Sequence, residues 1–288
     1  MIKCFKLTAM LAALIYFPVA AIAWGQLGHR IVGEIASSYL TPKAKVAVQK
    51  ILGNESLAMA SNWADFVKSD TAFRYLNSWH YIDFKEGLSE AEFNSYLATD
   101  SATDAYTKLN FIITQLKKES LPQEKKVMYL RLLVHIIGDI HQPMHTGRPE
   151  DMGGNKIKLS WFNQQTNLHS IWDDKIIEAQ QLSYTEYAKT INFATPIQIA
   201  AWQKETIAAW LYQSHQIAEK LYTEVAPDDK LSYRYSYYHL SILNKQLLEG
   251  GAFSRNYQPD FSITTNHNIK DLEVYLRGAF YFYISQKI

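Results

Sequence analysis

The segment LLVHIIGDIHQPMH, Leu132–His145, combines helical spacing with the side chains of a metal site. His135 and Asp139 are four residues apart, so they share one helix face, stacked a turn apart. Their neighbours are apolar on every side, which indicates a helix buried in the core. A carboxylate in such a helix is costly unless it is paired or bound to a metal. Pro143 then ends the helix and lets the chain fold back, and His145 follows this turn.

The same spacing recurs downstream, where LHSIWDD places His169 and Asp173 four residues apart. Other histidines and aspartates stand in short motifs elsewhere: His29, Asp65 in NWADFVK, His80 and Asp83 in WHYID, and His145. A single pair of this kind is most often an ordinary helix-face pair or a hydrogen-bonded core histidine. Two pairs with three further histidines favour a metal site. Imidazole and carboxylate are the ligands that zinc uses where no thiolate is present.

The first 23 residues are typical of a secretory signal peptide. Lys3 and Lys6 precede the apolar run LTAMLAALIYFPVA, and Ala21-Ile22-Ala23 forms a small-x-small cleavage pattern. We therefore expect cleavage between Ala23 and Trp24, a secreted or periplasmic protein, and no membrane span after signal removal. The only cysteine, Cys4, lies in this signal. The mature chain must then be stabilised by packing or by metals.

The charge of the chain is nearly balanced. Removal of the signal leaves 27 basic against 28 acidic side chains. Proteins that bind nucleic acid through lysine and arginine are normally basic. Any attraction for phosphate must therefore come from a local source.

The spacing of apolar residues predicts an all-α protein with one short β-hairpin, organised as a single large domain over residues 24–288. The hairpin is expected at 156–162, where Ile157, Leu159 and Trp161 alternate with polar residues before a turn-like NQQTN. A further helix opens at Thr195-Pro196 and carries an apolar stripe to Leu221. The other predicted helices cover 29–39, 41–52, 56–69, 101–118, 123–141, 230–249 and 269–286.

The motifs resemble, in order and spacing, those of the zinc-dependent single-strand nucleases of fungi and plants (S-one/P-one type). They are Trp24 with His29, the Asp65 of WAD, the His80 of WHY, HxxGDxHQPxH at 135–145, GGN at 153–155 and LHSxWD at 168–173. The resemblance covers the whole mature chain. It implies a catalytic nuclease domain with a fold related to that of zinc phospholipase C. It also implies hydrolysis of single-stranded DNA and RNA to 5′-phosphate products, with 3′-nucleotidase activity.

The resemblance further implies three zinc ions per chain. One would be held by Asp65, His80, His135 and Asp139, the second by Trp24, His29 and the same Asp139, and the third by His145, His169 and Asp173. Trp24 would bind through its α-amino group and carbonyl, so that signal cleavage completes the site. Two zinc ions bridged by the catalytic Asp139 can lower the pKa of a shared water molecule. The nucleophile would then be a metal-bound hydroxide.

Four positions match residues that the family places around the substrate. Tyr81 would stack on a base, and core packing is the alternative reading of this tyrosine. Asp83 would act as a polar catalytic residue beside the site. Lys68 stands where many relatives carry arginine, and it keeps the charge without the bidentate fork, so we expect weaker orientation of Asp83. Asn155 could bind substrate or hold the GGN turn.

Two alternatives remain at this stage. A zinc-dependent phospholipase C would share the helical fold and the three-metal site, but Asp173 and the short WGQLGH segment favour the nuclease. A zinc-binding module without catalysis is the second alternative. Nothing in the sequence points to a stable protein partner, and we expect a monomer. The remaining histidines are assigned to structural or surface roles, with His141 a candidate support for a ligand: His141, His215, His239 and His267.

Overall fold

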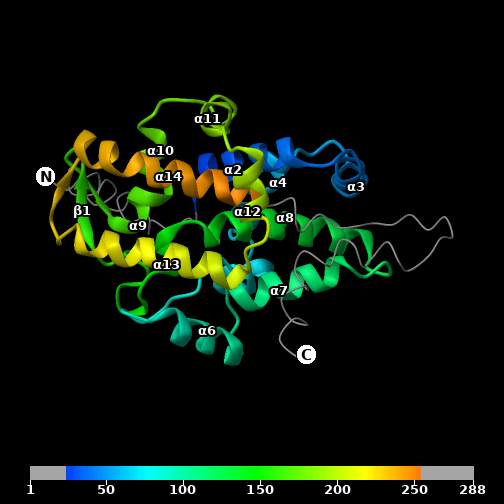
Figure 1. The fold of residues 1–288 in the computed structure, drawn as a ribbon, viewed down its shortest axis with the longest axis horizontal. Coiled ribbons are helices and arrows are strands. Elements are labelled where there is room, and N and C mark those ends of the chain that lie inside the picture. The colour runs from blue at the N-terminus through cyan, green and yellow to red at the C-terminus, as the bar shows by residue number, and fades with distance from the viewer. Residues whose placement is uncertain (1–23, 254–288) are drawn as a thin grey trace, which may run out of the picture.

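The computed structural model describes residues 24–253. The predicted signal peptide, the predicted helix over 269–286 and His267 lie outside these residues. Within them the chain is helical apart from one small sheet, as Figure 1 shows, which confirms the predicted fold class. Among residues 24–253, no helix has both the length and the apolar character needed to cross a bilayer.

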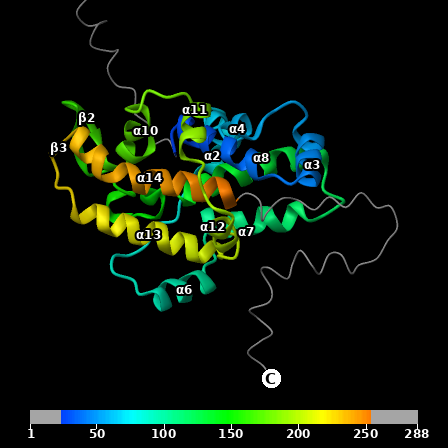
Figure 2. The same ribbon diagram turned by 45° about the horizontal axis from the view of Figure 1, so that its top comes forward.

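The long helices run lengthwise through the molecule (Figures 1 and 2). They are α2 (Gln26–Tyr39), α7 (Ala105–Leu116), α8 (Gln123–Ile140), α13 (Ile207–Thr223) and α14 (Tyr233–Phe253). Helix α8 contacts each of the other four. Its residues from Leu132 to Ile140 are all buried, as its unbroken apolar sequence predicts. Helix α8 therefore carries His135 and Asp139 into the interior of the protein.

Shorter helices surround this bundle, and several begin at the caps that their sequences indicate. Helix α3 (Pro42–Leu52) starts after Thr41, whose hydroxyl accepts a hydrogen bond from Ala44 N at 3.2 Å. The other short helices are α6 (Glu90–Thr99), α9 (Leu168–Ser170), α10 (Ile176–Glu178), α11 (Tyr184–Ile191) and α12 (Pro196–Trp202). Single-turn and irregular helices are η2 (Thr71–His80), η3 (Pro143–Thr146), η4 (Pro149–Asp151) and the π-helix η5 (Ile171–Lys175).

Two predicted helices are each divided in two. Residues 56–69 form α4 (Leu57–Ala60) and α5 (Trp63–Val67), because the Ser61 hydroxyl donates to the carbonyls of Ala58 and His29 and turns the chain. The helix predicted from Thr195 ends at Trp202. Thr206 then caps α13 by accepting a hydrogen bond from Ala209 N at 3.1 Å. The apolar residues keep their helical spacing across both breaks, so the sequence pattern predicted one continuous helix in each case.

The hairpin lies at one end of the molecule (Figure 2). Strand β1 (Lys158–Trp161) pairs antiparallel with β2 (Gln164–Asn167) and parallel with β3 (Lys230–Leu231). The NQQTN segment was wrongly interpreted as a turn, since most of it forms β2. The turn is Phe162-Asn163, both with positive φ, of 47° and 65°. The helix predicted from residue 230 begins at Tyr233, after β3.

Buried apolar residues form two clusters, and α2 contributes to both. Ala36 belongs to the cluster around α7 and α8, whereas Ile31, Val32 and Ile35 belong to the cluster around Trp24 and Trp172. The helix that carries His29 is therefore held from both sides.

Candidate metal centre

All eight predicted side-chain ligands fall into three groups of histidine and aspartate. The groups are His29, Asp65 and His135; His80, His135 and Asp139; and His145, His169 and Asp173. Within each group the potential ligand atoms lie within 4.8 Å of one another. Helix α2 carries His29, α5 carries Asp65, and α8 carries His135 and Asp139. The short or irregular helices η2, η3, α9 and η5 carry, in this order, His80, His145, His169 and Asp173. The third group is the one that the sequence analysis proposed.

Asp139 belongs to the second group, is fully buried, and also lies against a histidine of each of the other two groups. Its Oδ2 lies 3.0 Å from His80 Nδ1 and 3.1 Å from His135 Nε2. Its Oδ1 lies 3.3 Å from His29 Nε2 and 3.5 Å from His145 Nδ1. The two oxygens thus face different imidazoles, which is the arrangement that a carboxylate bridging two cations requires.

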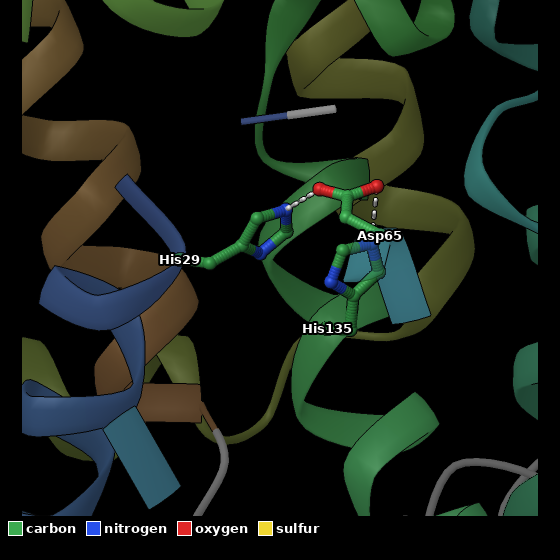
Figure 3. A group of neighbouring side chains, drawn as sticks. All are labelled: His29, Asp65 and His135. Carbon is green, nitrogen blue, oxygen red and sulfur yellow. Dashed lines mark ion pairs between the residues drawn. The ribbon is translucent and has the colours of Figure 1, made fainter. Parts of the chain in front are cut away.

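Figure 3 shows the carboxylate of Asp65 lying against the rings of His29 and His135. Asp65 Oδ2 is 3.8 Å from His29 Nε2, and Asp65 Oδ1 is 3.8 Å from His135 Nε2. The two imidazoles stack with their centroids 3.8 Å apart. A methyl group on Gly138 would lie 3.0 Å from His29 Nδ1, so the absence of a side chain there lets the ring approach α8.

Three histidines are oriented by backbone carbonyls. Nδ1 of His135 donates to Ser61 O at 2.6 Å, Nδ1 of His145 to His80 O at 2.7 Å, and Nδ1 of His169 to Gly153 O at 2.7 Å. A carbonyl only accepts, so Nδ1 carries a proton, and in the neutral ring the lone pair is then on Nε2. Orientation of a metal-binding histidine through its other nitrogen is usual in metal sites.

Gln142 supports Asp173 and was missed by the sequence analysis. Its Nε2 donates to Asp173 Oδ1 at 2.5 Å, and its Oε1 accepts from Met144 N at 2.5 Å. The side chain is fully buried. A glutamine between two candidate ligands in HxxGDxHQPxH was the signal that could have identified it.

The electrostatics of the centre favour the neutral form of two imidazoles, those of His29 and His80, and the ionised form of two carboxylates, those of Asp139 and Asp65. Burial lowers the pKa of His29, and it lowers the pKa of His80 to about 4. Burial opposes ionisation of Asp139 as well, but His135 and His145 hold its pKa well below the usual range. His135 and Lys68 likewise lower the pKa of Asp65 against the effect of burial. Burial lowers the pKa of His135 and His169, but Asp139 and Asp65 raise that of His135 and Asp173 raises that of His169, so cation binding would release a proton from these two rings.

Several buried polar atoms of the centre have no hydrogen-bond partner within the described residues. They are both ring nitrogens of His29, Nε2 of His80 and of His145, Oδ2 of Asp65 and Oδ1 of Asp139. Buried polar groups are otherwise almost always paired, because desolvation without a partner is costly. Cations coordinated between these atoms would satisfy them, so the residues fit the metal ions that the sequence implies.

Trp24 is fully buried beside the centre. Its indole Nε1 donates to Gly138 O at 2.6 Å, and the following Gly25 N donates to Asp173 O at 3.0 Å. These two bonds hold the backbone of Trp24 between α8 and η5. Coordination through its main-chain atoms stays a prediction.

The four predicted substrate residues differ in their surroundings. Lys68 Nζ bonds Asp65 Oδ1 at 2.6 Å and, in the described chain, forms no ion pair with Asp83. Burial, with Asp151 and Glu150 nearby, raises the pKa of Asp83 to about 6, although His169 opposes it. Tyr81 is 45% exposed, which rules out core packing. Asn155 Nδ2 donates to Met152 O at 2.8 Å and so holds the turn. Their roles toward substrate stay predictions.

The three other described histidines lie outside the groups. Nδ1 of His141, His215 and His239 bonds the carbonyls of Ile137, Thr146 and Tyr235, at 2.8, 2.8 and 2.7 Å. Their structural assignment agrees with these contacts, and no contact links the side chain of His141 to a candidate ligand.

The fold and the centre define a class: a helical protein whose interior gathers imidazoles and carboxylates into groups that could hold metal ions. The sequence model of the S1/P1 nuclease family matches residues 24–252, and the chain belongs to this family.

Individual relatives extend this match. The chain is 37% identical to Endonuclease 3 of Arabidopsis thaliana over 171 residues, which span 57% of this chain and 58% of the relative. It is 30% identical to Endonuclease 2 of the same plant over 257 residues, 80% of this chain and 87% of that one. It is 35% identical to Nuclease P1 of Penicillium citrinum over 183 residues, 58% and 65% of the two chains.

Proposed function

We propose that this protein is a secreted or periplasmic zinc-dependent nuclease that hydrolyses single-stranded DNA and RNA to 5′-phosphate products and removes 3′-phosphates from nucleotides. One observation carries the proposal: the buried carboxylate of Asp139 faces four imidazoles, with one oxygen unpartnered. Membership of the S1/P1 nuclease family supports the same activity.

Three zinc ions would be distributed as the motifs imply. Asp65, His80, His135 and Asp139 would hold the first, Trp24, His29 and Asp139 the second, and His145, His169 and Asp173 the third. Zinc bound there would lower the pKa of water near a scissile phosphate and neutralise the phosphate oxygens. Three divalent cations against three ligating aspartates leave the centre positive. The site would therefore attract phosphate although the chain carries almost no net charge.

The preference for single strands follows from the placement of the ligands. They are buried, and a phosphate reaches them only if its chain is flexible and its base can swing aside. The exposed ring of Tyr81 adjoins His80 and would stack on that base. Asp83 would act as a polar catalytic residue beside the site. Lys68, bonded to Asp65, would place a positive charge beside the phosphate.

The proposal is tested by metal analysis of the purified protein together with digestion of three substrates: single-stranded DNA, RNA and a phosphatidylcholine emulsion. We expect three zinc ions per chain, cleavage of both nucleic acids with 5′-phosphate ends, and release of phosphate from a 3′-nucleotide. Cleavage of the lipid without cleavage of nucleic acid would support a phospholipase C instead. Three bound ions without turnover of any phosphodiester would indicate a binding module.

Ligation by Trp24 requires a chain that begins at this residue. A protein with one extra residue before Trp24 should bind two zinc ions instead of three and lose most of its activity, because its α-amino group is displaced. The control is the protein that starts at Trp24, with its N-terminus verified by mass spectrometry. Three ions and full activity in the extended protein would contradict N-terminal ligation. Light scattering on the control protein tests the proposed monomer, and limited proteolysis tests the proposed single domain over residues 24–288.

A further inference from the structure

The loop that follows His145 is bonded to α13 at several points: Arg148 Nε donates to Glu219 Oε1 at 2.8 Å, and a tyrosine hydroxyl, that of Tyr222, connects α13 to the part of the loop that leads to the GGN turn. Tyr222 Oη accepts from Arg148 N at 3.1 Å and donates to Asp151 Oδ1 at 3.0 Å. The guanidinium of Arg148 also lies over the Tyr222 ring, 4.4 Å from its centroid. Burial raises the pKa of Tyr222 far above its ordinary value, so this hydroxyl keeps its proton. The hydroxyl therefore serves as donor and acceptor at once.

Asp151 links the Tyr222 hydroxyl to the GGN turn. Its Oδ1 also accepts from Gly154 N at 2.6 Å. Met152, Gly153 and Gly154 all have positive φ, of 58°, 59° and 81°. A methyl group on Gly153 would lie 2.3 Å from Met144 O, so the turn fits closely against η3. The direction of the peptide between Gly153 and Gly154 thus depends on the Asp151 carboxylate.

That peptide supplies the carbonyl that orients His169. Gly153 O accepts from His169 Nδ1 at 2.7 Å, and His169 Nε2 then lies 3.2 Å from Asp173 Oδ2. A continuous series of hydrogen bonds therefore runs from the Tyr222 hydroxyl, through Asp151 and the turn, to one ring of the third group.

We propose that Tyr222 is a positioning residue: through Asp151 and the GGN turn it orients His169 and so sets the affinity of the metal site formed by His145, His169 and Asp173. The inference rests on the proposed function, since it assumes that this group holds zinc. Tyr222 itself does not bind the metal. It acts through the carbonyl that keeps the His169 proton on Nδ1 and its lone pair on Nε2.

The test compares Tyr222→Phe with Tyr187→Phe in the purified protein. Tyr187 offers a matched control, because its hydroxyl also donates a part-buried hydrogen bond, to Asn244 Oδ1 at 2.8 Å, and lies outside the centre. Competition with a chelator measures the affinity of each zinc. In Tyr222→Phe we expect one of the three ions to bind about tenfold more weakly, the size of effect seen when a supporting group of a ligand is lost. Tyr187→Phe should match the wild type.

Variants of Asp151 separate positioning from general loosening. Asp151→Asn keeps an oxygen that can accept from Tyr222 and from Gly154 N, so it should retain nearly wild-type affinity. Asp151→Ala loses both bonds and should weaken the same single ion at least as much as Tyr222→Phe. Equal weakening of all three ions, or unchanged affinities in Tyr222→Phe, would overturn the inference.

A second measurement needs no metal. Nitrogen-15 NMR of the metal-free protein reports which nitrogen of His169 carries the proton. The spectra are recorded at alkaline pH, where the ring is neutral; we expect the Nδ1-protonated form in the wild type and in Tyr187→Phe, and a mixture of both neutral forms in Tyr222→Phe. An unchanged His169 signal in Tyr222→Phe would refute the positioning role. Absence of the third zinc from the wild type, with the His169 shift still seen in Tyr222→Phe, would instead refute the proposed function.

Discussion

Asp139 presents its two carboxylate oxygens to two different sets of rings. Oδ2 faces His80 and His135 at 3.0 and 3.1 Å, whereas Oδ1 faces His29 at 3.3 Å. The four-residue spacing in HIIGD predicted that His135 and Asp139 would meet. The same spacing says nothing of His80 and His29, which come from other elements. A residue's partners within one helix are therefore predictable, and its partners across the fold are not.

This geometry makes a prediction about metal content. Asp139→Ala should remove two of the three proposed zinc ions and abolish nuclease activity, because one carboxylate serves both sites. Asp173→Ala is the matched change, since Asp173 faces only the third group, and it should remove one ion. Elemental analysis of both proteins measures the difference. Loss of a single ion from Asp139→Ala would contradict the bridging role.

Helix α7 illustrates how an element can carry an electrostatic cost at its cap. Asp104 caps it by accepting from Thr107 N at 2.9 Å, as an N-cap residue should. Burial and the neighbouring Asp100 raise the pKa of Asp104 to about 6. Asp100 Oδ1 accepts from Ala102 N, and the protonated carboxyl of Asp104 donates a hydrogen bond to the side chain of Asp100.

The sign of the resulting pH dependence follows from linkage. Folded Asp104 holds its proton up to about pH 6, whereas the unfolded aspartate releases it near 3.8. The folded state therefore loses stability as the pH rises through this interval, and the loss persists above it. Asp100→Asn removes the opposing charge and should raise the melting temperature at pH 8, with the gain disappearing below pH 4.

The control is Asp70→Asn. Asp70 accepts from Ala72 N at 2.9 Å with the same local geometry as Asp100. It should show no gain that depends on pH. Equal melting temperatures of Asp100→Asn and the wild type at every pH would show that the two carboxyls do not interact.

At the scale of the whole molecule, the candidate centre joins parts of the chain that are far apart in sequence. His29 comes from α2, His80 from the end of η2, and His169 from α9, after the hairpin. Each is packed by one of two apolar clusters, and the ligands cannot separate without opening that packing. Metal binding is thus expected to stabilise the entire fold, not only the loops that hold it.

Chelation provides the test of this coupling. EDTA should inactivate the protein and lower its melting temperature, because each ion that binds only the native state adds about 2.7 kcal/mol at a hundredfold excess over its Kd. Readdition of zinc should restore both properties. A melting temperature that EDTA leaves unchanged would show that the centre is not coupled to folding.

The sequence alone determined the helical class and the caps at Thr41 and Thr195, because these depend on local spacing and on residue chemistry. Its motifs favoured a metal site, and their resemblance to a known family supplied the eight candidate side-chain ligands. The tertiary structure decided which ligands meet. It also placed Gln142 on Asp173, turned three ring nitrogens toward backbone carbonyls, and divided two helices that apolar spacing had made continuous. The contacts of Gln142 and of the three rings join residues between 16 and 74 positions apart. Only the packing of the helices sets those distances, and no local pattern encodes them.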